Sequence, residues 1–162
     1  MIRHATEADL PRILAIYDLA RQFMRQCGNM TQWVNGYPSE PLLRQDIAHG
    51  HLYVMEDGCS VYAAFAFIIG DDPTYAEIDG AWQDTVTPYG TIHRIGSDGT
   101  YCGVLGECVA WSRQRIPHLR IDTHADNRVM RRAIAQQGFA YCGVIHVADG
   151  TPRVAYELVR GT

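Results

Sequence analysis

The sequence predicts an α/β fold in which a mixed sheet of about seven strands is flanked by about four helices. The expected elements follow the order β, α, α, β, β, β, α, β, α, β, β, and a chain that mixes strands and helices in this way forms a sheet covered by helices. The chain has 162 residues, of which 47% are hydrophobic and 20% are charged. This length and composition fit one domain, residues 1–162, with one core.

The first part of the chain predicts one strand and two helices. Met1–Ala5 is expected to be a short strand. Thr6, with Asp9 three residues later, is a capping pattern for a helix that runs to about Cys27. A second helical pattern covers Ser39–His49. The apolar face expected for the first helix contains Leu10, Ile13, Leu14, Tyr17, Ala20 and Met24.

A hairpin and a long loop are expected next. His51–Glu56 and Val61–Ile69 are rich in β-branched and aromatic residues, and they flank Asp57-Gly58, a strong turn signal. The segment Asp71–Pro88 contains several acids, two prolines and a tryptophan, and its periodicity favours neither helix nor strand. It is therefore expected to be a loop with some local order.

Strands and helices alternate in the second half of the chain. One helix is expected over Cys102–Arg115, because Pro117 prevents it from continuing. Asp126 or Asn127 caps the next helix, which ends at Gly138. The strands expected around these helices are Tyr89–Ser97, Leu119–His124, Phe139–Val147 and Arg153–Val159.

Charge and composition exclude several classes of function. A net charge of -4 and a pI near 5.9 disfavour nucleic-acid and membrane-surface partners. The opening MIRHATEADL lacks the apolar core of a signal peptide, and no apolar run approaches the ~20 residues of a membrane span. A cytoplasmic location is expected. All 14 basic residues are arginines, which excludes a Walker-type phosphate loop and a lysine Schiff base.

The five cysteines are scattered and contain no C-x-x-C pair, so neither a disulfide framework nor a zinc knuckle is indicated. They are expected to be reduced and mostly buried. No metal is expected, because no metal-binding spacing is shared by His4, His49, His51, His118 and His146.

The segment Thr91–Trp111 predicts a strand, a glycine-bearing turn and a helix whose N-terminus holds the phosphates of a cofactor. Its glycines allow a close approach of the backbone to a ligand, and the first turn of a helix leaves about four amides that suit a pyrophosphate. On spacing alone, an ordinary glycine-rich turn explains the pattern equally well. A dinucleotide-binding turn fits poorly, because no G-x-G-x-x-G is present.

Short motifs spread over nearly the whole chain carry a family resemblance. They are Arg3 to Leu10, His93-Arg94-Ile95-Gly96-Ser97, Gly103-Val104-Leu105, Leu119 to Asn127, Gly138-Phe139, and Arg153 to Tyr156. Together they resemble the GCN5-related N-acetyltransferase (GNAT) superfamily. The resemblance implies a mixed, mostly antiparallel central sheet. It also implies direct transfer of an acetyl group from acetyl-CoA to a primary amine.

The same resemblance implies a set of cofactor-binding residues. They are Ile95, Gly96, Ser97, Thr100, Tyr101, Cys102, Gly103, Val104, Leu105, Asn127 and Arg131. The backbone of the first three would bond the pantetheine arm, and the amides of Thr100–Leu105 would hold the pyrophosphate. Asn127 would steady the cofactor, and Arg131 would meet a CoA phosphate. Where many relatives place a tyrosine that protonates the leaving thiolate, this chain has Ile134.

Two histidines are the candidate catalytic bases, since histidine exchanges protons near neutral pH. His93 lies two residues before Ile95, on the same face of a strand, and His124 ends the neighbouring strand. A packing role is the alternative for both. Asp122 and Glu77 are fallback bases, although Asp122 suits an ion pair with Arg94 or Arg120 and Glu77 suits a solvated loop.

The acceptor is expected to be an amine of a small molecule or peptide. Trp33 and Tyr37, both expected to be exposed, and Trp82 are candidates for the acceptor pocket. Two hypotheses follow: a cytoplasmic N-acetyltransferase, and a non-catalytic acyl-CoA-binding module of the same fold. A homodimer built on the last strand is left open.

Overall fold

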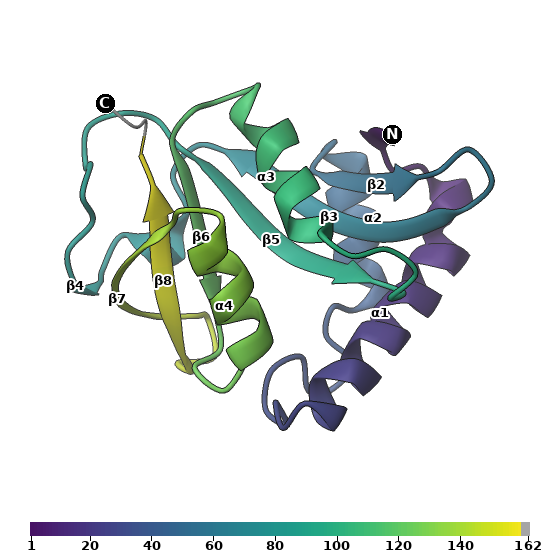
Figure 1. Ribbon diagram of the computed structural model, residues 1–162, viewed down its shortest axis with the longest axis horizontal. Coiled ribbons are helices and arrows are strands. Elements are labelled where there is room, and N and C mark those ends of the chain that lie inside the picture. The colour runs from purple at the N-terminus through teal and green to yellow at the C-terminus, as the bar shows by residue number, and fades with distance from the viewer. Residues whose placement is uncertain (160–162) are drawn as a thin grey trace. The chain divides into compact units, whose positions relative to one another are not determined.

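The computed structural model describes residues 1–159 of the chain (Figure 1). Contacts between residues divide it into two compact units. The first unit contains Met1–Phe67 and His93–Val104, and the second contains Ile68–Ile92 and the described chain from Leu105 onward. Strand β5 contributes residues to both units, and the expectation of a single domain stays a prediction.

Eight strands and four α-helices are present between residues 1 and 159. The helices are α1 (Leu10–Gln26), α2 (Glu40–Ala48), α3 (Val104–Arg113) and α4 (Arg128–Gln136), with short 3-10 helices η1 (Glu7–Asp9) and η2 (Pro73–Tyr75). The strands are β1 (Ile2–His4), β2 (Leu52–Glu56), β3 (Val61–Ile69), β4 (Asp79–Gly80), β5 (Gly90–Ser97), β6 (Leu119–Thr123), β7 (Ala140–His146) and β8 (Pro152–Leu158). Hydrogen bonding orders the strands β1-β2-β3-β5-β6-β8-β7-β4. Strands β5 and β6 pair in parallel, whereas the β1–β2, β2–β3, β6–β8, β7–β8 and β4–β7 pairs are antiparallel.

In the first unit, α1 packs its apolar face against β2 and β3. The buried residues of α1 are Leu10, Ile13, Ile16, Tyr17, Ala20 and Met24. Their spacing of three and four residues places them on one side of the helix, and they form one buried cluster with strand residues such as Leu52, Val54 and Ala64. The expected cap is confirmed: the amide and hydroxyl of Thr6 donate to Oδ2 of Asp9 at 2.8 and 3.0 Å.

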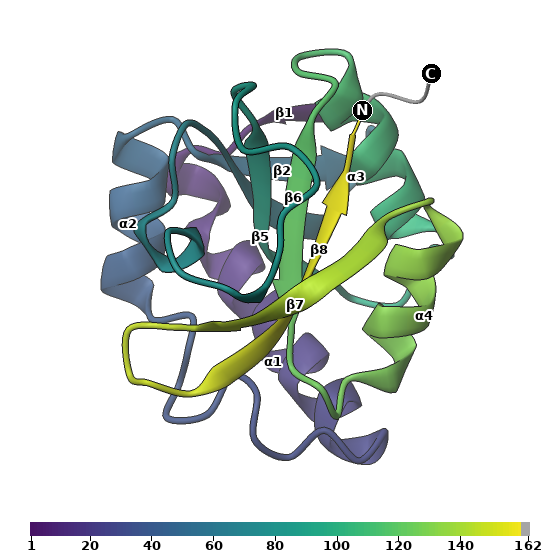
Figure 2. The same cartoon turned by 90° about the vertical axis from the view of Figure 1, so that its left-hand side faces the viewer.

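In the second unit, β6 lies between β5 and β8. It pairs in parallel with β5 over Gly90–Ile92 and in antiparallel fashion with β8. Strands β7 and β8 form a long hairpin (Figure 2). Helix α4 lies beside β8 (Figure 1), and Nε of Arg131 donates to the hydroxyl of Tyr156 at 3.1 Å.

The short strand β4 pairs with β7 through two glycines. A Cβ on Gly80 would lie 2.1 Å from the carbonyl oxygen of Cys142, and a Cβ on Gly143 would lie 2.2 Å from that of Asp79. Both glycines also have positive φ, 134° and 151°. Any side chain at either position would therefore separate the two strands.

The predicted fold class is confirmed, with one extra strand. The addition is β4, which falls in the segment Asp71–Pro88 that was expected to be a loop with local order. Helix α3 begins at Val104, two residues later than expected, because Gly103 has a φ of 76° that no α-helical residue adopts. Within the described residues, no helix combines the length and apolar character needed to cross a membrane.

Candidate functional site

A loop with two left-handed glycines joins β5 to α3, in the segment expected to hold phosphates. Gly99 and Gly103 have φ values of 83° and 76°, and a Cβ on either would meet no atom within 4 Å. All residues from Gly99 to Gly103 are exposed. Gly103 directly precedes α3, whose first amides have no partner within the helix and carry partial positive charge. This arrangement suits the oxygens of a phosphate group.

The same loop contains a carboxylate, Asp98, whose charge is compensated. Nη2 of Arg12 lies 2.5 Å from Oδ2 of Asp98, and Nε of Arg12 donates to the carbonyl of Val61 at 2.8 Å. Oδ1 of Asp98 accepts the amide of Thr100 at 2.8 Å. A phosphate at this loop would therefore face a neutralised acid, and one of the amides expected to bind it already has an acceptor.

Strand β5 is irregular at Arg94, whose φ is 51°. A non-glycine residue in the left-handed region costs about 1–3 kcal/mol and persists only where its surroundings hold it. The hydroxyl of Tyr17 donates to the carbonyl oxygen of Arg94 at 2.6 Å. Gly96 allows this approach, since a Cβ there would lie 3.1 Å from the ring of Tyr17. Helix α1 thus holds the irregular part of the strand.

Each of the three side-chain nitrogens of Arg94 donates to one of two partners. Its Nε and Nη2 donate to the two carboxylate oxygens of Asp46 at 3.0 Å each, and its Nη1 donates to the hydroxyl of Tyr37 at 3.3 Å. The side chains of Arg94 and Asp46 are 11% and 7% exposed. This buried, two-pronged ion pair joins α2 to β5.

The two aromatic residues of the α1–α2 loop differ in exposure. Trp33 is only 9% exposed, and its ring packs edge-on against that of Tyr17 at 5.4 Å between centroids. The expectation that Trp33 is exposed is therefore wrong, because this packing places the indole in the core of the first unit. Tyr37 is 38% exposed and contacts Arg94. A role of either residue in binding the acceptor stays a prediction.

The two candidate bases lie in different surroundings. His93 is half-buried in β5, and the left-handed Arg94 that follows it breaks the alternation of side chains on which a shared face with Ile95 was expected. His124 follows β6, and its Nδ1 accepts the amide of Asp126 at 3.1 Å. Nδ1 of His124 also lies 3.5 Å from Oδ2 of Asp126.

Helix α4 and its N-cap contain three residues singled out by the family resemblance. Asn127 caps the helix, since its Oδ1 accepts the amide of Met130 at 3.1 Å, as one of the two capping alternatives predicted. Nη1 of Arg131 donates to the carbonyl of Ala125 at 3.1 Å. Ile134 is fully buried. The binding of a cofactor by Asn127 and Arg131 stays a prediction.

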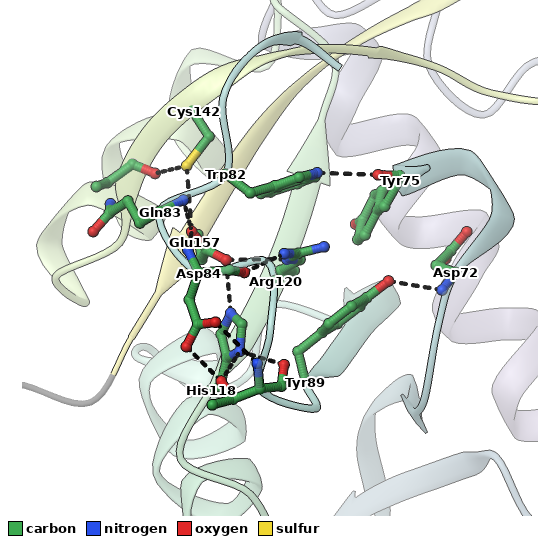
Figure 3. Close-up of polar contacts among 12 residues, drawn as sticks. Asp72, Tyr75, Trp82, Gln83, Asp84, Tyr89, His118, Arg120, Cys142 and Glu157 are labelled. Atoms are coloured by element: carbon green, nitrogen blue, oxygen red, sulfur yellow. Dashed lines mark hydrogen bonds and ion pairs between the residues drawn. The ribbon is translucent and has the colours of Figure 1, made fainter. Parts of the chain in front are cut away.

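Trp82 lies in the second unit, where its ring stacks on Arg120 and its Nε1 donates to the carbonyl of Tyr75 at 3.0 Å (Figure 3). The hydroxyl of Tyr75 in turn donates to Asp122 at 2.6 Å. The expectation that Asp122 pairs with Arg94 or Arg120 is wrong, since Asp46 and Glu157 take those positions. Glu77 is exposed, as expected of a loop acid.

The cysteines are all free, but three of the five are exposed, contrary to expectation: Cys27, Cys59 and Cys102. Cys108 and Cys142 are buried, and burial raises the pKa of both thiols. Between residues 1 and 159, no cluster of three or more histidine, cysteine, aspartate or glutamate side chains is arranged to hold a metal ion.

The residues that hold the irregular part of β5 and the loop that follows it were not predicted from the sequence. Asp46 and Tyr17 contact Arg94 from 48 and 77 residues away, and Arg12 contacts Asp98 from 86 residues away. No local pattern links such distant positions. The buried aspartate in the last turn of α2 is the one signal that can be recognised once the structure is known.

Several solved structures resemble the chain. An acetyltransferase of the GNAT family from Streptococcus agalactiae matches with a TM-score of 0.87 and 28% identity, over 100% of this chain and 96% of the other. A GNAT-family acetyltransferase from Listeria monocytogenes matches with a TM-score of 0.70 and 17% identity, over 98% and 94%. A ribosomal-protein-alanine N-acetyltransferase from Brucella melitensis matches with a TM-score of 0.60 and 20% identity, over 98% and 99%. No protein-family model and no curated protein matches the chain.

Proposed function

Because the chain belongs to the GNAT superfamily, we propose that it transfers an acetyl group from acetyl-CoA to a primary amine of a small molecule or peptide by direct attack. The observation that carries this proposal is the run from Arg94 to Gly103. In it, a strand that contains a left-handed residue leads into an open glycine loop at the start of a helix.

The residues of this run fit acetyl-CoA. The backbone of Ile95, Gly96 and Ser97 is proposed to bond the pantetheine arm. The amides from Tyr101 to Leu105 are proposed to hold the pyrophosphate, because the amide of Thr100 is engaged by Asp98. Asp98 itself does not repel the phosphates strongly, since Arg12 compensates its charge. When bound, acetyl-CoA supplies an activated thioester.

The protein contributes position and a base. An amide next to the irregular part of β5, near Ile95, is proposed to polarise the thioester carbonyl. His93 is proposed as the base that takes a proton from the amine, because it directly precedes the irregular part of β5 where the thioester is proposed to lie. Ile134 cannot donate a proton to the leaving thiolate, and this proton is proposed to come from water.

The buried Ile134 also favours a second function, a non-catalytic acyl-CoA-binding module. Both functions require acyl-CoA binding. We further propose a cytoplasmic location and an acceptor that is neither nucleic acid nor membrane. A homodimer remains a proposal as well.

Cofactor binding can be tested with the exposed Cys102, which lies in the glycine loop. Acetyl-CoA should slow the alkylation of Cys102 by iodoacetamide, as followed by peptide mass spectrometry. Cys27 on the same molecule is the internal control. Acetyl-CoA at a hundredfold excess over its dissociation constant should also stabilise the fold by about 2.7 kcal/mol. Equal alkylation of Cys102 with and without acetyl-CoA, and no stabilisation, would exclude both functions.

Catalysis can be tested by following the release of CoA thiol with a library of primary amines. Turnover that is lost in His93→Ala and retained in His124→Ala would support the proposed base. A loss confined to His124→Ala would contradict it. Binding of acetyl-CoA without turnover of any amine would favour the non-catalytic module.

A further inference from the structure

The second unit contains a pocket of about 470 Å³. Its wall is formed by the segments 70–73, 75–76 and 85–89, together with Trp82 and Arg120. Three of the side chains in the wall are aromatic: Tyr75, Trp82 and Tyr89. A concave site of this size, with aromatic walls and a few polar groups, is typical of small-molecule binding.

Arg120 is a rigidly held cation in this wall. It is only 5% exposed, and its guanidinium carbon lies 4.0 Å from the ring centroid of Trp82 on one face and of Tyr89 on the other (Figure 3). Nε donates to Oε1 of Glu157 at 3.1 Å, and Nη2 donates to the carbonyl of Asp84 at 2.7 Å. These contacts fix the plane and the rotation of the guanidinium group.

One edge of the Arg120 guanidinium is left for a ligand. Nη1 donates to no residue between 1 and 159, and Figure 3 shows a guanidinium nitrogen directed away from Glu157 and Asp84, toward Tyr75. The carboxylate of Glu157 is shared between Arg120 and the backbone, because it also accepts a hydrogen bond from the amide of Gln83 at 2.5 Å. Guanidinium has five donors, and the hydrogen bonds to Glu157 and Asp84 use only two of them. A planar edge of this kind is matched best by a carboxylate.

The pocket also contains negative charge. Asp71 is exposed and belongs to the wall, as does Asp72, whose Oδ1 accepts the amide of Thr74 at 2.9 Å. A purely anionic ligand would be repelled by these acids, whereas a ligand with both charges is attracted by each group. We propose that this pocket binds a free amino acid, with its carboxylate on Arg120, its ammonium group toward Asp71, and its side chain against the aromatic walls. This site does not depend on the proposed acetyl transfer.

The test is calorimetric titration of the full-length protein with the twenty common amino acids. For the tightest binder, the same protein is titrated with the analogue that lacks the carboxylate and the analogue that lacks the amino group; for phenylalanine these are phenethylamine and 3-phenylpropionate. Each analogue should bind at least about tenfold more weakly, since each loses a charge-assisted contact. The proposal is overturned if no amino acid binds at millimolar concentration, or if the amine binds as tightly as its amino acid.

Variants locate the binding. Ala76→Trp should fill the pocket and abolish binding, because Ala76 is an exposed part of its wall. Ala148→Trp, on an exposed residue that does not line the pocket, is the matched control. Asp71→Asn should weaken the amino acid but not the analogue without the amino group. These variants avoid Arg120, whose loss would disturb the fold. Unchanged binding in a folded Ala76→Trp variant would place the ligand elsewhere.

Discussion

Two buried arginines, Arg94 in β5 and Arg120 in β6, show how the partners of a side chain decide its role. Each is followed by isoleucine, and both guanidinium groups lie beside aromatic residues. Asp46 and Tyr37 occupy all three nitrogens of Arg94. Arg120 is held by two ring faces, one carboxylate bond and one carbonyl bond, and one nitrogen is left over.

The difference separates a structural cation from a binding cation. The side chain of Arg94 joins α2 to the irregular strand β5, and its charge is compensated by Asp46 within the protein. Arg120 is also buried, but two ring faces help to hold it, and only two of its three nitrogens donate to the protein. Burial alone therefore does not indicate which arginine binds a ligand. The better indication is whether a side-chain nitrogen lacks an acceptor within the protein.

The largest expected effect comes from removing the partner of Arg94. Asp46→Ala would leave a buried guanidinium without its carboxylate, and we expect the free energy of unfolding to fall by about 3–5 kcal/mol. Chemical denaturation measures this change. The control is Glu40→Ala, which removes the exposed partner of Arg44 and should cost less than about 1 kcal/mol. Similar losses in both variants would show that Arg94 is not the structural cation described above.

A smaller effect is expected when the backbone of Arg94 loses its support. Tyr17→Phe removes the hydroxyl that donates to the Arg94 carbonyl, and we expect a loss of about 1 kcal/mol in the free energy of unfolding. If the proposed acetyl transfer occurs, its rate should also fall, because the neighbouring amide is no longer held in place. Tyr141→Phe, at an exposed tyrosine, is the control. Full activity in Tyr17→Phe would show that the support given by Tyr17 to the irregular part of β5 is not needed for catalysis.

The smallest expected effect is a dependence of stability on pH. It involves one tyrosine near each of the two arginines. Burial raises the pKa of Tyr17, beside Arg94, and that of Tyr75, in the pocket of Arg120, above the ordinary value of 10.0. An unfolded chain loses these protons near pH 10, whereas the folded chain keeps them. The stability that the two phenols contribute is therefore complete below pH 10 and falls as the pH rises further.

At pH 10.5 the expected loss is under about 1 kcal/mol for each tyrosine. Denaturation curves at pH 9 and 10.5 should show a smaller decline in Tyr75→Phe and in Tyr17→Phe than in the unaltered protein. Absorbance at 295 nm checks the cause, since the buried Tyr17 and Tyr75 should resist ionisation until the protein unfolds. The hydrogen bond to Asp57 also raises the pKa of the exposed Tyr101. Ionisation of all nine tyrosines near pH 10 in the folded protein would contradict the assignment.

The elements of the fold were largely predictable because their signals are local. The cap formed by Thr6 and Asp9 lies within four residues, and Asp57 turns the β2–β3 hairpin by accepting the amides of Cys59 and Ser60. Strand β4 was not predictable, because two residues carry no periodicity and the pairing depends on Gly143, more than sixty residues away.

The candidate site was predictable only in part. Its glycine loop could be recognised because the loop consists of consecutive residues. The contacts of Arg94 could not, because they come from three distant segments of the chain. The pattern of Asp122 beside two arginines in neighbouring strands suggested the wrong ion pair, since charge alone does not select among several acids. The prediction for Trp33 was wrong for a related reason. The composition of its loop indicated an exposed side chain, but the indole is buried because it packs on Tyr17.

The contact between Gly80 and Gly143 has a consequence for how the amino-acid pocket could evolve. Trp82 follows this contact by two residues, and the amide of Ala81 between them donates to the carbonyl of Cys142 at 3.0 Å. The position of the indole is thus anchored by a pair of residues that have no side chains. Substitutions of the residues in the wall can alter which ligand is preferred, but a substitution at either glycine would displace the wall itself. Descendants of this protein should vary freely around the pocket while keeping both glycines.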